Sequence, residues 1–238
     1  MAEKQKLIYW IALASILVLA AFMRLYGIHW DEGFPYTPHP DERAILMKTQ
    51  DMHFPKLDQL GTLLDSEKSP LNPRWFPYGT FPIYVLKITE SITSTITEQT
   101  IDLRTYGRLL SSLADLGTII GTSLLALKAF GRRTAVLAAL LTAFAVLHIQ
   151  LAHFFAFDTF AAFFATWATL FAYKYAQEGK TSNSIYAAVF VGLGMACKIS
   201  LLPIIGMLLA AHIYYIARSP SLAQNLRDKL IIIGSHLC

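Results

Sequence analysis

Long apolar segments separated by short polar ones dominate this chain. A helix needs about 20 apolar residues to cross the hydrocarbon core of a bilayer. Six segments approach that length, at 7–26, 109–129, 134–151, 155–176, 185–199 and 200–217. A further one begins at Leu230 and stops within a few residues, at the end of the chain. The pattern predicts an all-α polytopic membrane protein, and we interpret 1–238 as the N-terminal part of a longer helix bundle.

Composition and charge favour the same class. Hydrophobic residues make up 55% of the 238 residues and charged residues 15%, and the mean hydropathy is +0.45. A soluble domain is about one quarter charged. The net charge of +4 comes from short basic runs beside apolar segments, which predicts a lipid bilayer and no nucleic acid as partner. Two cysteines, Cys197 and Cys238, indicate neither a disulfide framework nor a metal site.

The first apolar segment has two interpretations. Lys4 and Lys6 precede it, as in a secretory signal peptide. It is longer than the core of such a peptide, and Arg24 stands where small residues would mark a cleavage site. These features favour an uncleaved membrane helix.

The basic residues predict how the chain threads the membrane. They fall at every second connection, as expected for cytoplasmic ends: Lys4, Lys6, Lys128, Arg132, Arg133, Lys174, Lys180, Arg218, Arg227 and Lys229. The loop 27–108, the turn near 150–156 and the break around Lys198 would then face outward. The long loop includes an aromatic, proline-broken segment from Trp75 to Tyr84, typical of the approach to a helix at the membrane interface.

The stretch HPDER places His39, Asp41 and Glu42 just after the first apolar segment. Pro40 fixes the backbone ahead of a short helix, so Asp41 falls in its first turn. A carboxylate held there could remove a proton from an acceptor as a general base. The alternative is a helix start on a solvated loop, where acidic residues also interact well with the helix dipole.

A second acidic pair lies ten residues earlier in the same loop. Asp31 and Glu32 are followed by Gly33 and Pro35, which suggest a turn. They are rival candidates for the base, and the HPDER context favours Asp41.

Asp158 is the one charged residue between 151 and 173, in an aromatic run. An ionisable group inside a membrane segment costs about 2.5–3.5 kcal/mol at the bilayer centre and less near a face. The threading puts Asp158 near the outer face, where it could share a cavity with Asp41 or cap the start of a helix. His153 is interpreted as an interfacial histidine.

Three basic residues on the outer side are candidates for holding a phosphate. Lys198 follows a glycine-rich helix, and it could either hold a phosphate or extend to the interface without a function. Arg104 and Arg108 could neutralise a lipid phosphate, and we expect Asp115 to pair with one of them. Carboxylates and cations at one membrane face indicate group transfer from a lipid phosphate.

The order of these motifs resembles a known superfamily. The segments HPDER, NPRWFPYGTFPIYVLK, the helix ending in FGRR, LAHFFAFDTF and GLGMACKISLLPI are similar to the N-terminal half of GT-C membrane glycosyltransferases, in the branch of protein O-mannosyltransferases and aminoarabinose transferases. The resemblance covers nearly the whole chain. It implies Asp41 as catalytic base with Glu42 beside it, Asp158 supporting the acceptor or the base, and Lys198 near the donor phosphate. His39 and Tyr78 are added as candidate substrate-binding residues.

The resemblance also implies a reaction and its setting. A sugar would move from a polyprenyl-phosphate donor to a protein, lipid or glycan acceptor, with inversion, at the outer face of a prokaryotic plasma membrane. We infer no cofactor and no metal. A transporter or flippase of lipid-linked sugars, and a non-catalytic truncated relic, remain alternatives.

Overall fold

The structure, a computed structural model, describes residues 2–219, and this range contains helices and no strand. The predicted segment at Leu230 lies outside the described residues. In chain order the elements are α1 (Ala2–Leu25), α2 (Pro40–Asp51), the 3-10 helix η1 (Leu57–Thr62), α3 (Phe81–Thr97), α4 (Leu103–Phe130), α5 (Arg132–Ala143), α6 (Val146–Ala152), α7 (Phe157–Glu178), α8 (Thr181–Cys197), the 3-10 helix η2 (Ile199–Leu201) and α9 (Ile204–Arg218).

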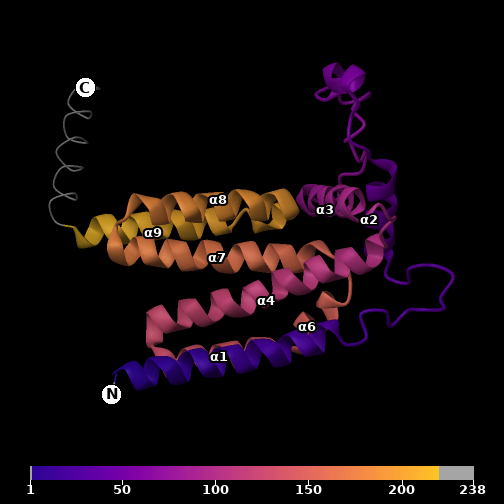
Figure 1. The fold of residues 1–238 in the computed structure, drawn as a ribbon. Coiled ribbons are helices and arrows are strands. Elements are labelled where there is room, and N and C mark those ends of the chain that lie inside the picture. Colours follow the sequence, from indigo (N-terminus) through magenta and orange to yellow (C-terminus); the bar gives the residue numbers. More distant parts are fainter. Residues whose placement is uncertain (1, 220–238) are drawn as a thin grey trace, which may run out of the picture.

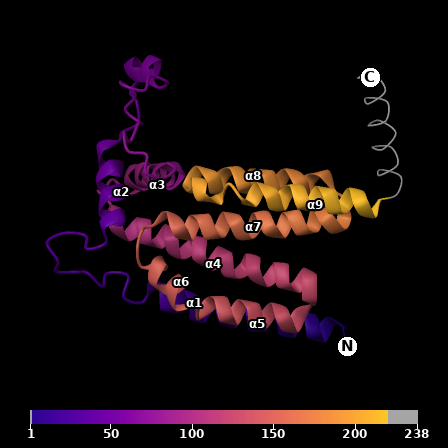
Figure 2. The ribbon, with the colours of Figure 1, turned by 180° about the vertical axis from the view of Figure 1, so that it is seen from behind.

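The long helices form one bundle with its small helices gathered at one end. α1, α4, α5, α7, α8 and α9 lie side by side, and successive members run in opposite directions (Figure 1; Figure 2). α2 and α3 lie together at the end where α4 and α7 begin. α3 is seen close to end-on in Figure 1, so it crosses the direction of the bundle.

Fewer helices qualify as membrane spans on their own than the sequence predicts. Glu3–Leu25, Leu103–Phe130 and Ile199–Arg218 are long and apolar enough, and α5 with α6 makes a fourth if that bent pair is one span. α8 is apolar but has 17 residues, at the short end of the range for a membrane span. α7 has 22 residues, but its threonines, tyrosines and charged residues reduce its mean hydropathy.

The predicted segment 134–151 is two helices rather than one. α5 and α6 are bent by 56° at the break after Ala143. A break in a membrane helix frees backbone carbonyls that need new partners. Here Arg24 of α1 supplies one, because its Nη1 donates to the Ala143 carbonyl at 3.0 Å.

The expected pairing of Asp115 with Arg104 or Arg108 is wrong. Asp115 is fully buried in α4 and accepts from Arg24 Nε at 2.5 Å. Its other carboxylate oxygen contacts Nδ1 of His148 in α6. Oppositely charged residues within a bundle pair across helices, and this pair joins α1 to α4 beside the α5–α6 break.

Small residues let the helices of this part of the bundle approach closely. Ala135, Ala139 and Ala143 recur every four residues along α5 and are at most 1% exposed. They pack with α1 and α4 in one buried cluster, as small residues do in membrane helix interfaces. Large apolar side chains of α1 and α9 are instead exposed on the outside of the bundle, where lipid would cover them.

Basic residues gather at the end of the bundle opposite α2 and α3. They stand at the start of α1, at the α4–α5 and α7–α8 turns, and at the end of α9, and these places share one end in Figure 1. The residues are Lys4, Lys6, Lys128, Arg132, Arg133, Lys174, Lys180 and Arg218. Arg227 and Lys229 lie outside the described residues.

Candidate active site

The HPDER stretch starts α2, and His39 is its N-cap. The His39 Nδ1 accepts the backbone N–H of Glu42 at 3.2 Å, and Pro40 occupies the first helical position. The imidazole also stacks on Phe154, with ring centroids 4.4 Å apart. This cap fixes where α2 begins and places Asp41 in its first turn, partly exposed.

A buried ion cluster holds α2 against the bundle. Arg108 is fully buried, and its guanidinium donates to both carboxylate oxygens of Glu42 and both of Asp31, each at 2.8 Å. Its Nη1 also donates to the Ile28 carbonyl at 2.6 Å. Glu42 is fully buried as well and accepts the N–H of Phe155 at 2.9 Å. Residues from four separate segments are therefore tied together through one arginine.

Arg104 completes the charge balance of this cluster. Its Nη1 lies 3.1 Å from Asp31 Oδ2, so two arginines face two carboxylates. The hydrogen bond from Arg108 lowers the pKa of Asp31 below its ordinary value of 3.8, against the opposing effect of burial. Asp31 is thus an ionised structural group that is 1% exposed.

A second contact holds the aromatic segment before α3, from Trp75 to Gly79, against the end of α8. The N–H of Gly79 donates to the Cys197 carbonyl at 2.9 Å. A Cβ at Gly79 would lie 1.8 Å from the Ala196 carbonyl oxygen, so only glycine permits this approach. The preceding Tyr78 packs on Phe157, with ring centroids 5.1 Å apart.

Four polar side chains meet beside this anchor. The Tyr78 hydroxyl donates to Asp41 Oδ2 across a long 3.5 Å. Lys198 Nζ lies 5.5 Å from the centroid of the Tyr78 ring and 2.7 Å from Asp158 Oδ1. The side chains of Lys198 and Asp158 are 31% and 46% exposed, so the pair remains open to a ligand.

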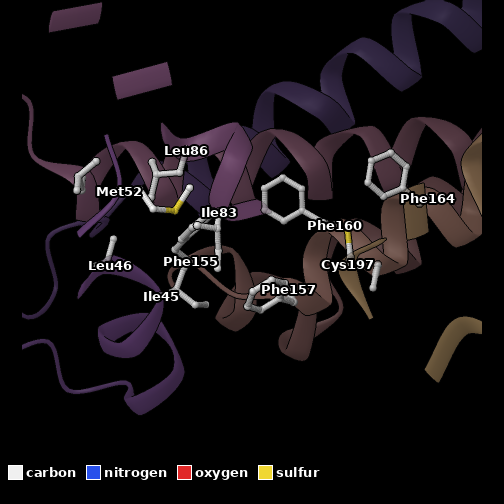
Figure 3. Close-up of a cluster of buried hydrophobic side chains, with 12 residues drawn as sticks. Ile45, Leu46, Met52, Ile83, Leu86, Phe155, Phe157, Phe160, Phe164 and Cys197 are labelled. Atoms are coloured by element: carbon white, nitrogen blue, oxygen red, sulfur yellow. The ribbon is translucent and has the colours of Figure 1, made fainter. Parts of the chain in front are cut away.

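A buried apolar cluster lies next to these four polar side chains. Figure 3 shows Ile45 and Leu46 of α2, Ile83 and Leu86 of α3, and aromatic rings around the start of α7 gathered together. Phe155 and Phe157 are at most 2% exposed. Because α2, α3 and α7 share one core, the positions of Asp41, Tyr78 and Asp158 are fixed relative to each other.

The structure separates the predicted site residues into two groups. Asp41, Tyr78, Asp158 and Lys198 come together at the partly exposed surface. Glu42, Arg108, Arg104 and His39 form the ion cluster and the helix cap instead. Within residues 3–219, no three His, Cys, Asp or Glu side chains are placed to hold a metal ion.

Sequence reasoning missed Gly79 and the Arg24–Asp115 pair. Gly79 precedes no recognisable turn motif, and its requirement comes from a helix end more than 100 residues away. Arg24 and Asp115 did carry a signal, because an opposite charge in each of two apolar helices indicates a cross-helix pair.

Comparison with known proteins identifies one family. The family model described as dolichyl-phosphate-mannose-protein mannosyltransferase matches residues 89–238, more than half of the chain. No curated protein and no solved structure matches the chain.

Proposed function

Because the chain belongs to the dolichyl-phosphate-mannose-protein mannosyltransferase family, we propose that Asp41 is the general base of a sugar transfer from a polyprenyl-phosphate donor. The family makes the chain a membrane glycosyltransferase and implies a lipid-linked sugar as donor. The acceptor, the stereochemistry, the membrane face and the catalytic residues are parts of the proposal.

One observation carries the choice of Asp41. Its carboxylate is partly exposed. Among the described residues its one side-chain hydrogen-bond partner is the Tyr78 hydroxyl, at 3.5 Å. The rival Asp31 is 1% exposed and bonded to two arginines. A general base needs an accessible carboxylate with a free oxygen near the acceptor, and Asp41 meets that need where Asp31 does not.

The proposed reaction is a direct displacement. The acceptor oxygen attacks the anomeric carbon of the donor while its proton passes to Asp41. The bond between that carbon and the phosphate oxygen breaks, and polyprenyl phosphate leaves with the electron pair. Attack from the side opposite the phosphate inverts the anomeric centre.

Lys198 and Asp158 have complementary proposed roles in this step. An ammonium has three N–H donors, and one already meets Asp158 at 2.7 Å. The remaining donors can meet the donor phosphate and stabilise its developing charge. Asp158 fixes the position of that ammonium, whereas Glu42 acts on Asp41 only by holding α2 in place.

The charge distribution supports an outward orientation for the site. Basic residues collect at the bundle end opposite α2 and α3, and such residues favour the cytoplasmic side. We therefore propose that Asp41 faces the extracytoplasmic side, where α3 lies along the interface.

Asp41→Asn tests the proposal. Membranes containing the full chain are incubated with dolichyl-phosphate-[³H]mannose, and label is counted in protein, lipid and glycan fractions. General-base catalysis contributes about 10²–10⁴-fold, so we expect label incorporation to fall by about that factor. The thermal unfolding midpoint should stay unchanged, because Asp41 makes one weak hydrogen bond.

Asp51→Asn is the matched control, since Asp51 is on the same helix, is exposed, and within the described part of the chain pairs with Lys48 alone, at 3.6 Å. It should transfer sugar as the parent does. Full transfer by Asp41→Asn would overturn the assignment of the base. Movement of the donor across vesicles with no transfer by the parent would favour a flippase.

A further inference from the structure

A groove lies between α1 and α5 at the basic end of the bundle, where Figure 2 shows the starts of these two helices side by side. Its volume is about 460 Å³, within the range of small-molecule sites. Ile8 and Ala12 of α1 form one wall and Val136 of α5 forms the other. The walls are thus apolar and suited to hydrocarbon.

One part of the groove lining is held in place by a chain of hydrogen bonds. Tyr9 lines the groove, is 2% exposed, and pairs its hydroxyl with the Ser123 hydroxyl at 3.0 Å. Ser123 Oγ in turn donates to the Ala135 carbonyl at 3.1 Å. These bonds join α1, α4 and α5 and hold the two walls of the groove in a fixed relation.

Two arginines, Arg132 and Arg133, also line the groove. Arg132 donates to Gln5 Oε1 at 3.3 Å, and Arg133 is exposed. Among the ion pairs of the described residues, neither arginine takes part. α5 also begins at Arg132 without a side-chain cap, which adds the positive end of its dipole.

We propose that this groove binds an anionic phospholipid from the leaflet at the basic end of the bundle. The two guanidinium groups bind the phosphate of the headgroup, as arginine forks do. The first part of an acyl chain lies along Ile8, Ala12 and Val136. Basic pockets between membrane helices select anionic headgroups in this way, and the site is separate from the proposed sugar transfer.

Lipid titration followed by native mass spectrometry tests the proposal on the full chain in detergent. The probes are dioleoyl phosphatidylglycerol and dioleoyl phosphatidylcholine. The parent should bind phosphatidylglycerol more tightly. Arg132→Ala with Arg133→Ala should raise its apparent Kd about 30-fold, equivalent to about 1 kcal/mol for each basic residue at 1.4 kcal/mol per factor of ten. The Kd for phosphatidylcholine should rise by a smaller factor, because the choline ammonium of that lipid already neutralises its phosphate.

Lys174→Ala with Lys180→Ala is the matched control, because it removes two charges at the same end from α7 and the start of α8. It should bind phosphatidylglycerol as the parent does. Val136→Phe narrows the apolar wall without changing charge and should also weaken binding. Equal loss in the lysine pair, parental binding by the arginine pair, or equal binding of both lipids by the parent would overturn the proposal.

Discussion

Arg108→Met is the sharpest test of how the ion cluster holds the proposed base. The change removes five hydrogen bonds of 2.6–2.8 Å from a fully buried guanidinium. It leaves Asp31 and Glu42 buried, and among the described residues the one remaining ion-pair partner is the partly exposed Arg104, which contacts Asp31. Removing one partner of a buried ion pair costs about 3–5 kcal/mol, because the remaining charge stays desolvated.

The expected loss converts into a large change in thermal stability. For a chain of this size about 1 kcal/mol shifts the unfolding midpoint by about 2–4 °C. Arg108→Met should therefore lower the midpoint by about 6–20 °C. It should also reduce sugar transfer, because α2 loses the contact that orients Asp41.

The chain contains a built-in probe for this measurement. Cys197 is fully buried, so a thiol-reactive fluorophore reports its exposure on heating. A Cys238→Ser background makes Cys197 the one remaining thiol, because the chain has two cysteines. Arg43→Met is the matched control on α2, where an exposed arginine lies 5.4 Å from the centroid of the Tyr36 ring.

A compensated variant separates lost charge pairing from lost packing. Arg108→Met combined with Asp31→Asn and Glu42→Gln removes the unpaired carboxylates as well. Burying a neutral amide costs far less free energy than burying an unpaired carboxylate, so this variant should regain part of the loss in unfolding midpoint. An unfolding midpoint for Arg108→Met within 2 °C of the control, or no recovery in the triple variant, would refute the reasoning.

Two further predictions concern the loop anchor and the response to acid. Gly79→Ala should lower sugar transfer at least tenfold and reduce the unfolding midpoint, because the new Cβ meets a backbone carbonyl at 1.8 Å that cannot yield; parental activity would show that the loop contact is dispensable. The hydrogen bond from Arg108 keeps the folded pKa of Asp31 below 3.8, so its stabilising contribution is complete above about pH 4 and is lost as pH falls through the folded pKa. Midpoints measured between pH 7 and pH 3 should therefore fall less steeply for Asp31→Asn than for the parent, and parallel profiles would contradict this linkage.

The sequence predicted the helical bundle well where a single segment carries the signal. Apolar run length alone indicates α1, α4 and α9, because spanning a bilayer needs a continuous apolar helix. The bend between α5 and α6 has no such local signal. Phe144 and Ala145 at the break are ordinary helix formers, and the bend accompanies a carbonyl contact from Arg24 in another helix.

In the candidate site, too, the local sequence indicates some features, whereas others depend on contacts between residues far apart in the chain. Asp31 and Asp41 both begin Asp-Glu pairs in one polar loop, so their local sequence distinguishes them weakly. They differ in burial and in contact with Arg108, which is 77 residues from Asp31. Such long-range contacts determine which carboxylate is structural. They cannot be recognised from the local sequence around each aspartate.

The contacts of Glu42 set an order of events during synthesis of the chain. Its partners Arg108 and Phe155 lie 66 and 113 residues later in the sequence. When the ribosome has delivered α1 and α2 to the membrane, neither partner has been made. Glu42 of α2 cannot make these contacts until Arg108 of α4 and Phe155, just before α7, have been synthesised. The proposed base can therefore be held in place by these contacts only after more than 100 further residues have been synthesised.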